Sequence, residues 1–353
     1  MHARTGRRIS RTLDPLSPAR SATSALQGSG LPGAVSLRPA TLVLFATLLL
    51  ISAAVPATVT AQQPATAGAE ASAAVEPLPS GELVRRIDSL AAHTLEAGPV
   101  ASLAVGVKKG ERVLLARGYG MADVENGVEA EPTTVYRIGS ITKQFTAAAV
   151  MQLVEAGEIG LDDPMTDYLP DYPTQGHEVT IRHLLTHTSG IRSYTGLDAW
   201  RPKMRLDLGD EELVDLFRDE PFDFAPGEQY AYNNSAYYLL GMIVGEVSGE
   251  PYPEYVESRL FEPLGLTASR YCDERRIIPG RAAGYASQDG RLVNADYLDM
   301  GQPGAAGALC STVLDLLSWS AALRGGAVVS PGSYERMTTS FTEGTAVREE
   351  RTP

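Results

Sequence analysis

The chain has 353 residues, of which 44% are hydrophobic and 21% are charged, and its formal net charge is −13 at pH 7. This acidic balance argues against a protein that binds nucleic acid through phosphate contacts. No internal repeat is evident, and two cysteines are too few for a disulfide scaffold. The length and composition favour one globular unit rather than a repeat, fibrous or disulfide-rich protein.

An apolar stretch without charge covers residues 40–55, preceded by six arginines and one acidic residue. The stretch is short for a membrane span and is typical of the hydrophobic region of a secretory signal peptide. Residues 59–61 resemble a small-residue cleavage site. The sequence therefore predicts a signal peptide over residues 1–61 and export to the periplasm or the medium. The alternative is that this segment stays uncleaved as an N-terminal membrane anchor. Apart from that alternative, no stable membrane partner is expected.

Residues 1–61 hold six of the 30 basic and one of the 43 acidic residues, so the remainder carries a net charge of −18. Residues 62–79 are rich in Ala, Pro and Glu and are predicted to form a flexible linker. A domain is expected over residues 80–353. It opens with a helix that is capped by Ser80 and has a predicted buried stripe of Leu83, Ile87, Leu90 and Leu95.

Only residues 101–107 and 112–117 are predicted to form strands. They are expected to pair as a hairpin with a turn at Lys109-Gly110. A hairpin of two strands alone is marginally stable, and its open edge invites pairing with other chains.

The sequence Ser140-Ile141-Thr142-Lys143 opens an almost wholly apolar run that ends at Gly157. Residues three apart share a helix face, so Lys143 is expected beside the Ser140 hydroxyl. A serine is a weak nucleophile unless a base takes its proton, and a desolvated lysine can do so. The alternative is that Ser140 only caps the helix, since such a pair arises by chance in roughly one chain in three of this composition.

A second constellation contains Tyr232, Asn233 and Asn234. Either asparagine can cap the helix that follows, whose apolar positions repeat at helical spacing up to Ser248-Gly249. A phenol at the start of a helix beside two amides places a proton carrier next to hydrogen-bond donors. The alternative is an aromatic loop that packs on the core.

Together these motifs resemble those of the serine β-lactamase and penicillin-binding protein superfamily, in its class C-like branch. The family's serine-x-x-lysine motif matches Ser140 and Lys143, and its tyrosine-x-asparagine motif matches Tyr232 and Asn234, about ninety residues further on. The Ser-Asp-Asn triplet of class A enzymes does not occur in the chain. Three more stretches, residues 183–191, 255–266 and 307–316, are similar to family sequences. The resemblance covers about residues 80 to 340.

The resemblance implies an α/β (α+β, two-lobed) β-lactamase/transpeptidase-like fold, with an antiparallel sheet flanked by helices and a mainly helical lobe. It implies a serine hydrolase that works through an acyl-enzyme and needs no cofactor and no metal. In this reading Ser140 attacks the carbonyl carbon and Lys143, with Tyr232, takes the hydroxyl proton. Tyr232 protonates the leaving group, and Asn234 binds the substrate amide and orients the lysine. The substrate is a β-lactam, a D-amino-acid peptide or a small ester, either a small molecule or derived from peptidoglycan.

The family's third motif, Lys-Thr-Gly or His-x-Gly, lies on an inner strand that supplies an oxyanion donor, and we find no match at a suitable place. The resemblance therefore implies a domain that is incomplete at its C-terminus. Loss of one oxyanion donor typically costs about 100- to 1000-fold in rate. The alternative function is accordingly a weakly active or inactive protein that binds cell-wall peptide without turnover. The oligomeric state is not predicted.

Two further residue pairs have alternative roles. His183 and His187 have a spacing that suits a metal, but a third ligand is not evident, so a structural role at a helix end is favoured. Cys272 and Cys310 either pair in an oxidising compartment or remain buried thiols, and the lack of other disulfide signals favours thiols.

Overall fold

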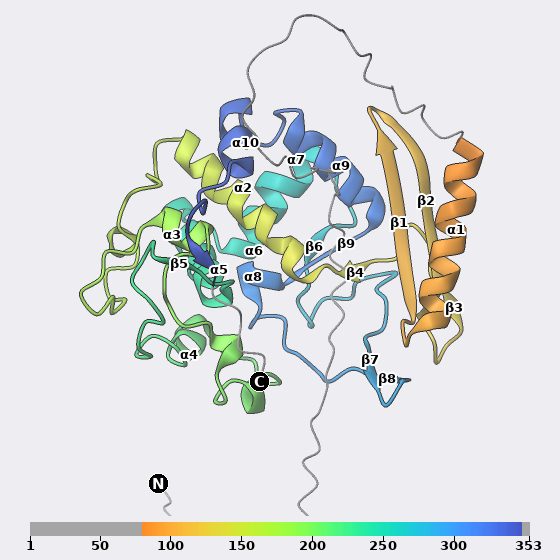
Figure 1. The fold of residues 1–353 in the computed structure, drawn as a ribbon, viewed down its shortest axis with the longest axis horizontal. Coiled ribbons are helices and arrows are strands. Elements are labelled where there is room, and N and C mark those ends of the chain that lie inside the picture. The colour runs from red at the N-terminus through yellow and green to blue at the C-terminus, as the bar shows by residue number, and fades with distance from the viewer. Residues whose placement is uncertain (1–79, 348–353) are drawn as a thin grey trace, which may run out of the picture. The chain divides into compact units, whose positions relative to one another are not determined.

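The computed structural model describes residues 80–347 (Figure 1), so the predicted signal peptide and linker lie outside the described residues. The helices are α1 (Ser80–Ala97), α2 (Thr142–Glu155), α3 (Ile181–Leu185), α4 (Asp210–Val214), α5 (Asn234–Ser248), α6 (Tyr252–Tyr255), α7 (Glu262–Leu264), α8 (Gly304–Gly307), α9 (Val313–Arg324) and α10 (Pro331–Thr338). Within residues 80–347, no helix is both long and apolar enough to cross a membrane.

The strands form small sheets. They are β1 (Ser102–Lys109), β2 (Arg112–Asp123), β3 (Val128–Glu129), β4 (Tyr136–Arg137), β5 (Gln229–Tyr230), β6 (Arg270–Tyr271), β7 (Tyr285–Gln288), β8 (Arg291–Asn294), β9 (Leu309–Ser311) and β10 (Ala346–Val347). The sheet orders are β1-β2-β3, β4-β9-β6, β7-β8 and β10-β5. All pairs are antiparallel except β10 with β5.

The predicted hairpin is confirmed as β1 and β2, but it does not stand alone. The longer β2 also pairs with β3, α1 packs against β2, and α9 packs against β1 (Figure 1). At Gly106 in β1, an added Cβ would come within 2.6 Å of the Val313 side chain. The glycine therefore lets α9 approach the strand closely, and this cover supplies the burial that an isolated hairpin lacks.

The predicted buried stripe of α1 is wrong at one position. Leu90 is 66% exposed, whereas Ala91 is buried at 4%. The partly buried positions Leu83, Ile87 and Leu95 differ from Ala91 by multiples of four, and residues four apart lie on one helix face. Leu90 lies about 100° away from Ala91 around the helix and so faces solvent.

The main core surrounds α2 and α5. Phe145 of α2 stacks on Trp319 of α9 at 4.0 Å between ring centres and meets Phe261 edge-on at 5.6 Å. The predicted apolar face of α5 is buried, and the helix ends at Gly249 with φ of +71°. Because α2 contacts core side chains on nearly all sides, its N-terminal end is fixed relative to α5 and α9.

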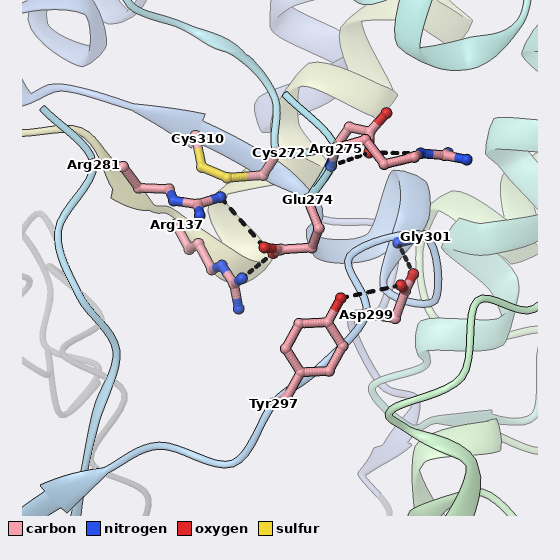
Figure 2. Close-up of polar contacts among 10 residues, drawn as sticks. Arg137, Cys272, Glu274, Arg275, Arg281, Tyr297, Asp299, Gly301 and Cys310 are labelled. Carbon is pink, nitrogen blue, oxygen red and sulfur yellow. Dashed lines mark hydrogen bonds and ion pairs between the residues drawn. A yellow bond between two sulfur atoms is a disulfide. The ribbon is translucent and has the colours of Figure 1, made fainter. Parts of the chain in front are cut away.

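The prediction for the two cysteines is wrong. Cys272 and Cys310 form a disulfide, with their Cα atoms 5.4 Å apart and both residues fully buried (Figure 2). Cys310 is in β9, and the backbone N–H of Cys272, directly after β6, donates to the Ala308 carbonyl at 2.8 Å. Antiparallel pairing of β6 with β9 brings the two residues together, and a separation of 38 residues in the sequence gave no sign of this.

We expect the double substitution Cys272→Ala with Cys310→Ala to lower the free energy of unfolding by about 2–4 kcal/mol, because it releases a long closed loop in the unfolded chain. Denaturant unfolding of the purified variant and of the oxidised wild type measures this difference. Reduced wild-type protein is the matched control and should unfold near the variant. A variant as stable as the oxidised protein would contradict a stabilising role for the disulfide.

Candidate active site

Ser140 lies in a short 3-10 turn, Gly139–Ile141, that leads directly into α2. The sequence predicted that the helix itself begins at Ser140, but the first α-helical residue is Thr142. Gly139 has φ of +51°, a left-handed conformation that glycine adopts without steric cost. This turn redirects the chain from β4 into α2, and Ser140 remains exposed to solvent.

The turn is held against β9 on both sides of Ser140. The backbone N–H of Ile138 donates to the Leu309 carbonyl at 2.9 Å. The Leu309 N–H in turn donates to Oγ1 of the buried Thr142 at 3.1 Å. One residue of β9 therefore fixes both flanks of the predicted nucleophile.

Lys143 follows Ser140 by one helical turn, and only 7% of its surface is exposed. Its ammonium donates to Asn234 Oδ1 and to the Ala306 carbonyl, each at 2.8 Å. Lys143 Nζ lies 3.4 Å from Ser140 Oγ. A buried charge is tolerated only where hydrogen bonds replace its water. These acceptors from α5 and α8 therefore allow a lysine on an otherwise apolar helix.

Tyr232 approaches Ser140 from the segment between β5 and α5. Its hydroxyl donates to Ser140 Oγ at 2.6 Å across a separation of 92 residues. Lys143 Nζ lies 4.6 Å from the centre of the Tyr232 ring, within cation–π range. The structure thus brings the predicted phenol, hydroxyl and amine together.

Asn234 completes the set as the first residue of α5. Besides accepting from Lys143, it donates from Nδ2 to Thr195 Oγ1 at 3.0 Å, and its backbone N–H donates to Ser193 Oγ at 3.2 Å. The four predicted side chains therefore form one hydrogen-bonded group. Asn234 contacts the lysine as predicted, while its contact with a substrate stays a prediction.

Sequence reasoning missed three residues that hold this group. Ala306 acts through its backbone carbonyl, so its side-chain type carries no signal. Ser193 and Thr195 belong to a polar run directly after Gly190-Ile191, and their hydroxyls could have marked that run as a partner of a helix start.

The segment from Ile191 to Tyr194 is fastened to the start of α5. Asn233 is the N-cap of α5, accepting a backbone N–H through Oδ1, and its Nδ2 donates to the Ile191 carbonyl. Ser235 Oγ donates to the Arg192 carbonyl and accepts from the Tyr194 N–H, both at 2.8 Å. These buried bonds fix the chain on both sides of Asn234.

The two histidines of the 183–191 stretch have structural contacts. His183 Nδ1 accepts from the Thr180 N–H at 3.2 Å in the capping box of α3. His187 Nδ1 accepts from the Asn233 N–H at 3.0 Å. Burial, and then the charge of Lys143, lowers the pKa of His187 to about 3. No group of three or more His, Cys, Asp or Glu residues within the described part of the chain is arranged to hold a metal ion.

A cavity of about 440 Å³ adjoins the group, and Lys143, His187, Tyr230 and Tyr237 are among its lining residues. A larger cavity of about 660 Å³ is lined by Glu274, Tyr297 and Asp299, among others, and its lining includes none of the four predicted site residues. Figure 2 shows the side chains of these three lining residues. Of these two cavities, the smaller one adjoins Lys143, and its lining residues do not include Ser140, Tyr232 or Asn234.

A family model described as Beta-lactamase matches residues 87–352, which is most of the chain. The chain belongs to the beta-lactamase family. Among the curated relatives of the chain, the penicillin-binding protein homologue PbpX of Bacillus subtilis (strain 168) is 32% identical over 241 residues. The match covers 68% of this chain but only 58% of PbpX.

Solved structures similar to this chain confirm the β-lactamase/transpeptidase-like fold. The octameric penicillin-binding protein homologue from Pyrococcus abyssi has a TM-score of 0.62 and 35% identity, over 74% of this chain and 60% of its own. A D-stereospecific amidohydrolase from Streptomyces sp. has a TM-score of 0.63 and 29% identity, over 72% of this chain and 76% of its own.

We expect Asn233→Ala to lower the free energy of unfolding by about 2 kcal/mol, because it removes an N-cap and a buried hydrogen bond to Ile191. The matched control is Asn233→Ser, which keeps a neutral cap acceptor but loses the Nδ2 donor, so its loss should be smaller. Denaturant unfolding of both variants measures the difference. Equal losses would show that the cap contributes nothing.

Proposed function

We propose that this member of the beta-lactamase family is a serine hydrolase that forms an acyl-enzyme on Ser140. The observation that carries the proposal is the contact of three groups: Ser140 Oγ lies 2.6 Å from the Tyr232 oxygen and 3.4 Å from Lys143 Nζ. An exposed hydroxyl with two proton carriers in reach is the arrangement that nucleophilic catalysis by serine requires.

In the proposed reaction, Ser140 Oγ bonds to the carbonyl carbon while its proton passes to the Tyr232 oxygen. Tyr232 must first be a phenolate, and the ammonium of Lys143 stabilises that anion. The same proton then moves to the leaving nitrogen or oxygen as its bond to carbon breaks. Water afterwards attacks the ester, and the proton transfers run in reverse to release the acid and restore Ser140.

The contacts of the neighbouring Tyr237 support Tyr232 as the reacting phenol. The ring centre of Tyr237 also lies near Lys143 Nζ, at 5.4 Å. The Tyr237 hydroxyl, however, donates to the Leu185 carbonyl at 3.0 Å. Burial raises the pKa of Tyr237, which keeps that phenol protonated.

In the proposal, the backbone N–H of Ser140, at the entrance to α2, is one donor to the developing oxyanion.

For the substrate we propose an amide or ester whose acyl part fits beside Lys143: a β-lactam, a D-amino-acid peptide or a small ester. The name of the Streptomyces relative, a D-stereospecific amidohydrolase, supports amides of D-configured residues. We further propose that the chain is exported by residues 1–61 and meets peptidoglycan-derived substrates outside the cytoplasm.

The test is covalent labelling of the purified chain with a fluorescent penicillin and, separately, a fluorophosphonate, read by intact mass. We expect one adduct per chain in the wild type and none in Ser140→Ala. Tyr232→Phe should slow acylation by about 100-fold or more, the usual contribution of a general base. Hydrolysis of a D-alanine anilide, its L-enantiomer and an aryl acetate then separates the substrate classes.

The matched control is Tyr285→Phe, which removes a phenol on β7 that accepts from the Val124 N–H, away from the candidate site. It should label at the wild-type rate. A folded wild-type chain that reacts with neither probe would overturn the proposal and favour a binding protein without turnover. An adduct that persists in Ser140→Ala would show that the nucleophile is wrong.

A further inference from the structure

His187 belongs to the sequence stretch 183–191, and the proposed reaction gives this histidine no role. Its backbone carbonyl accepts from the N–H of Ala231 at 3.0 Å. Its side-chain Nδ1 accepts from the N–H of Asn233, also at 3.0 Å. These two donors are the residues directly before and after Tyr232, so a single histidine bonds the chain on both sides of the proposed proton carrier.

The imidazole ring also contacts the Tyr232 ring. The two ring centres lie 4.6 Å apart with a tilt of 35° between planes. Two further aromatic rings lie near the imidazole. The centre of the Tyr237 ring is 5.0 Å from the centre of the His187 ring, and the Tyr230 ring meets it edge-on at 5.8 Å. The ring contact limits rotation of the Tyr232 side chain, while the two hydrogen bonds limit its backbone.

The backbone of His187 is adapted to this double contact. Its φ is +59°, a left-handed conformation that most residues avoid and that histidine adopts more readily than bulky or β-branched residues do. α3 ends at Leu185, so the chain turns sharply just before His187. The turn lets the carbonyl and the side chain of one residue reach two amides that are themselves two residues apart.

The charges around the ring favour the neutral form that the Asn233 contact requires. Nδ1 accepts a hydrogen bond only when it carries no proton. The ring is packed among Tyr230, Tyr232 and Tyr237, with the ammonium of Lys143 nearby, and both burial and that positive charge disfavour an imidazolium.

We propose that His187 is the positioning residue for Tyr232: as a neutral acceptor and ring platform it directs the phenol onto Ser140. This inference rests on the proposed acyl-enzyme function for its kinetic consequence, but the contact itself is testable without activity. No described contact joins His187 to Ser140, and in the proposal His187 does not touch the reacting carbonyl. It therefore acts through Tyr232.

The chain offers a matched control in His183, four residues earlier. Its Nδ1 also accepts a backbone N–H, but that of Thr180, the N-cap residue of α3. We expect His187→Phe, which keeps a ring and loses the acceptor, to lower the maximal acylation rate at least tenfold with little change in the concentration of probe for half-maximal rate. His183→Phe should leave both parameters near wild type. The reverse pattern, or equal rates in all three proteins, would overturn the inference.

A measurement that needs no turnover is amide hydrogen exchange followed by NMR. In His187→Phe, exchange at the Asn233 amide should accelerate at least tenfold, while Ala231, whose acceptor is a backbone carbonyl, should change much less. His183→Phe should alter neither amide. An Asn233 amide that stays protected in His187→Phe would overturn the inference, whether or not the chain is active.

A third measurement uses the wild-type chain, in case the variant does not fold. The ¹⁵N spectrum of the imidazole should show Nδ1 without a proton, coupled through its hydrogen bond to the Asn233 nitrogen, from pH 7 down to pH 4.5. A proton on Nδ1 in this range would overturn the inference. If the wild type shows this coupling but never forms an adduct on Ser140, the proposed function fails while the contact stands.

Discussion

The hydrogen bonds of the Lys143 ammonium are the interaction on which the rest of the site depends. They join three segments that are distant in the sequence: α2, the start of α5 through Asn234, and α8 through the Ala306 carbonyl. A buried ammonium without acceptors is too costly to persist in an apolar core. The core packing of α2 against α5 and the polar contacts of Lys143 therefore require the same arrangement of helices.

A second constraint concerns the segments that carry no proposed catalytic side chain. β9 holds the Ser140 turn through Leu309, and its neighbour Cys310 is fixed by the disulfide to Cys272. Near the same strand, Glu274 accepts from both Arg137 of β4 and Arg281 (Figure 2). The nucleophile turn is thus bonded to a strand that carries a disulfide, and β4, directly before the turn, is ion-paired through Arg137. Such supporting contacts give a reactive group on a turn a defined position.

The Tyr232 side of the site is supported in a comparable way. The segment after α3 contacts the start of α5 through Ser193, Ser235 and Asn233, and His187 bonds both neighbours of Tyr232. The exposed Ser140 and the partly buried Tyr232 therefore both lie on short connecting segments, and hydrogen bonds of neighbouring residues hold each segment in place. Buried donors and acceptors that are all paired specify one arrangement of the chain.

The sequence alone determined the α2 and α5 helices, the β1–β2 hairpin and the four residues of the candidate site, because each depends on local periodicity or on a spaced motif. It placed the start of α2 two residues early, put Leu90 in the buried stripe of α1 and left the cysteines as thiols. Only the tertiary structure decided the disulfide, the Ala306 carbonyl that receives Lys143 and the contacts of His187 with Tyr232. These depend on which distant segments become neighbours, and on backbone groups that every residue carries, so no pattern of side-chain types could reveal them.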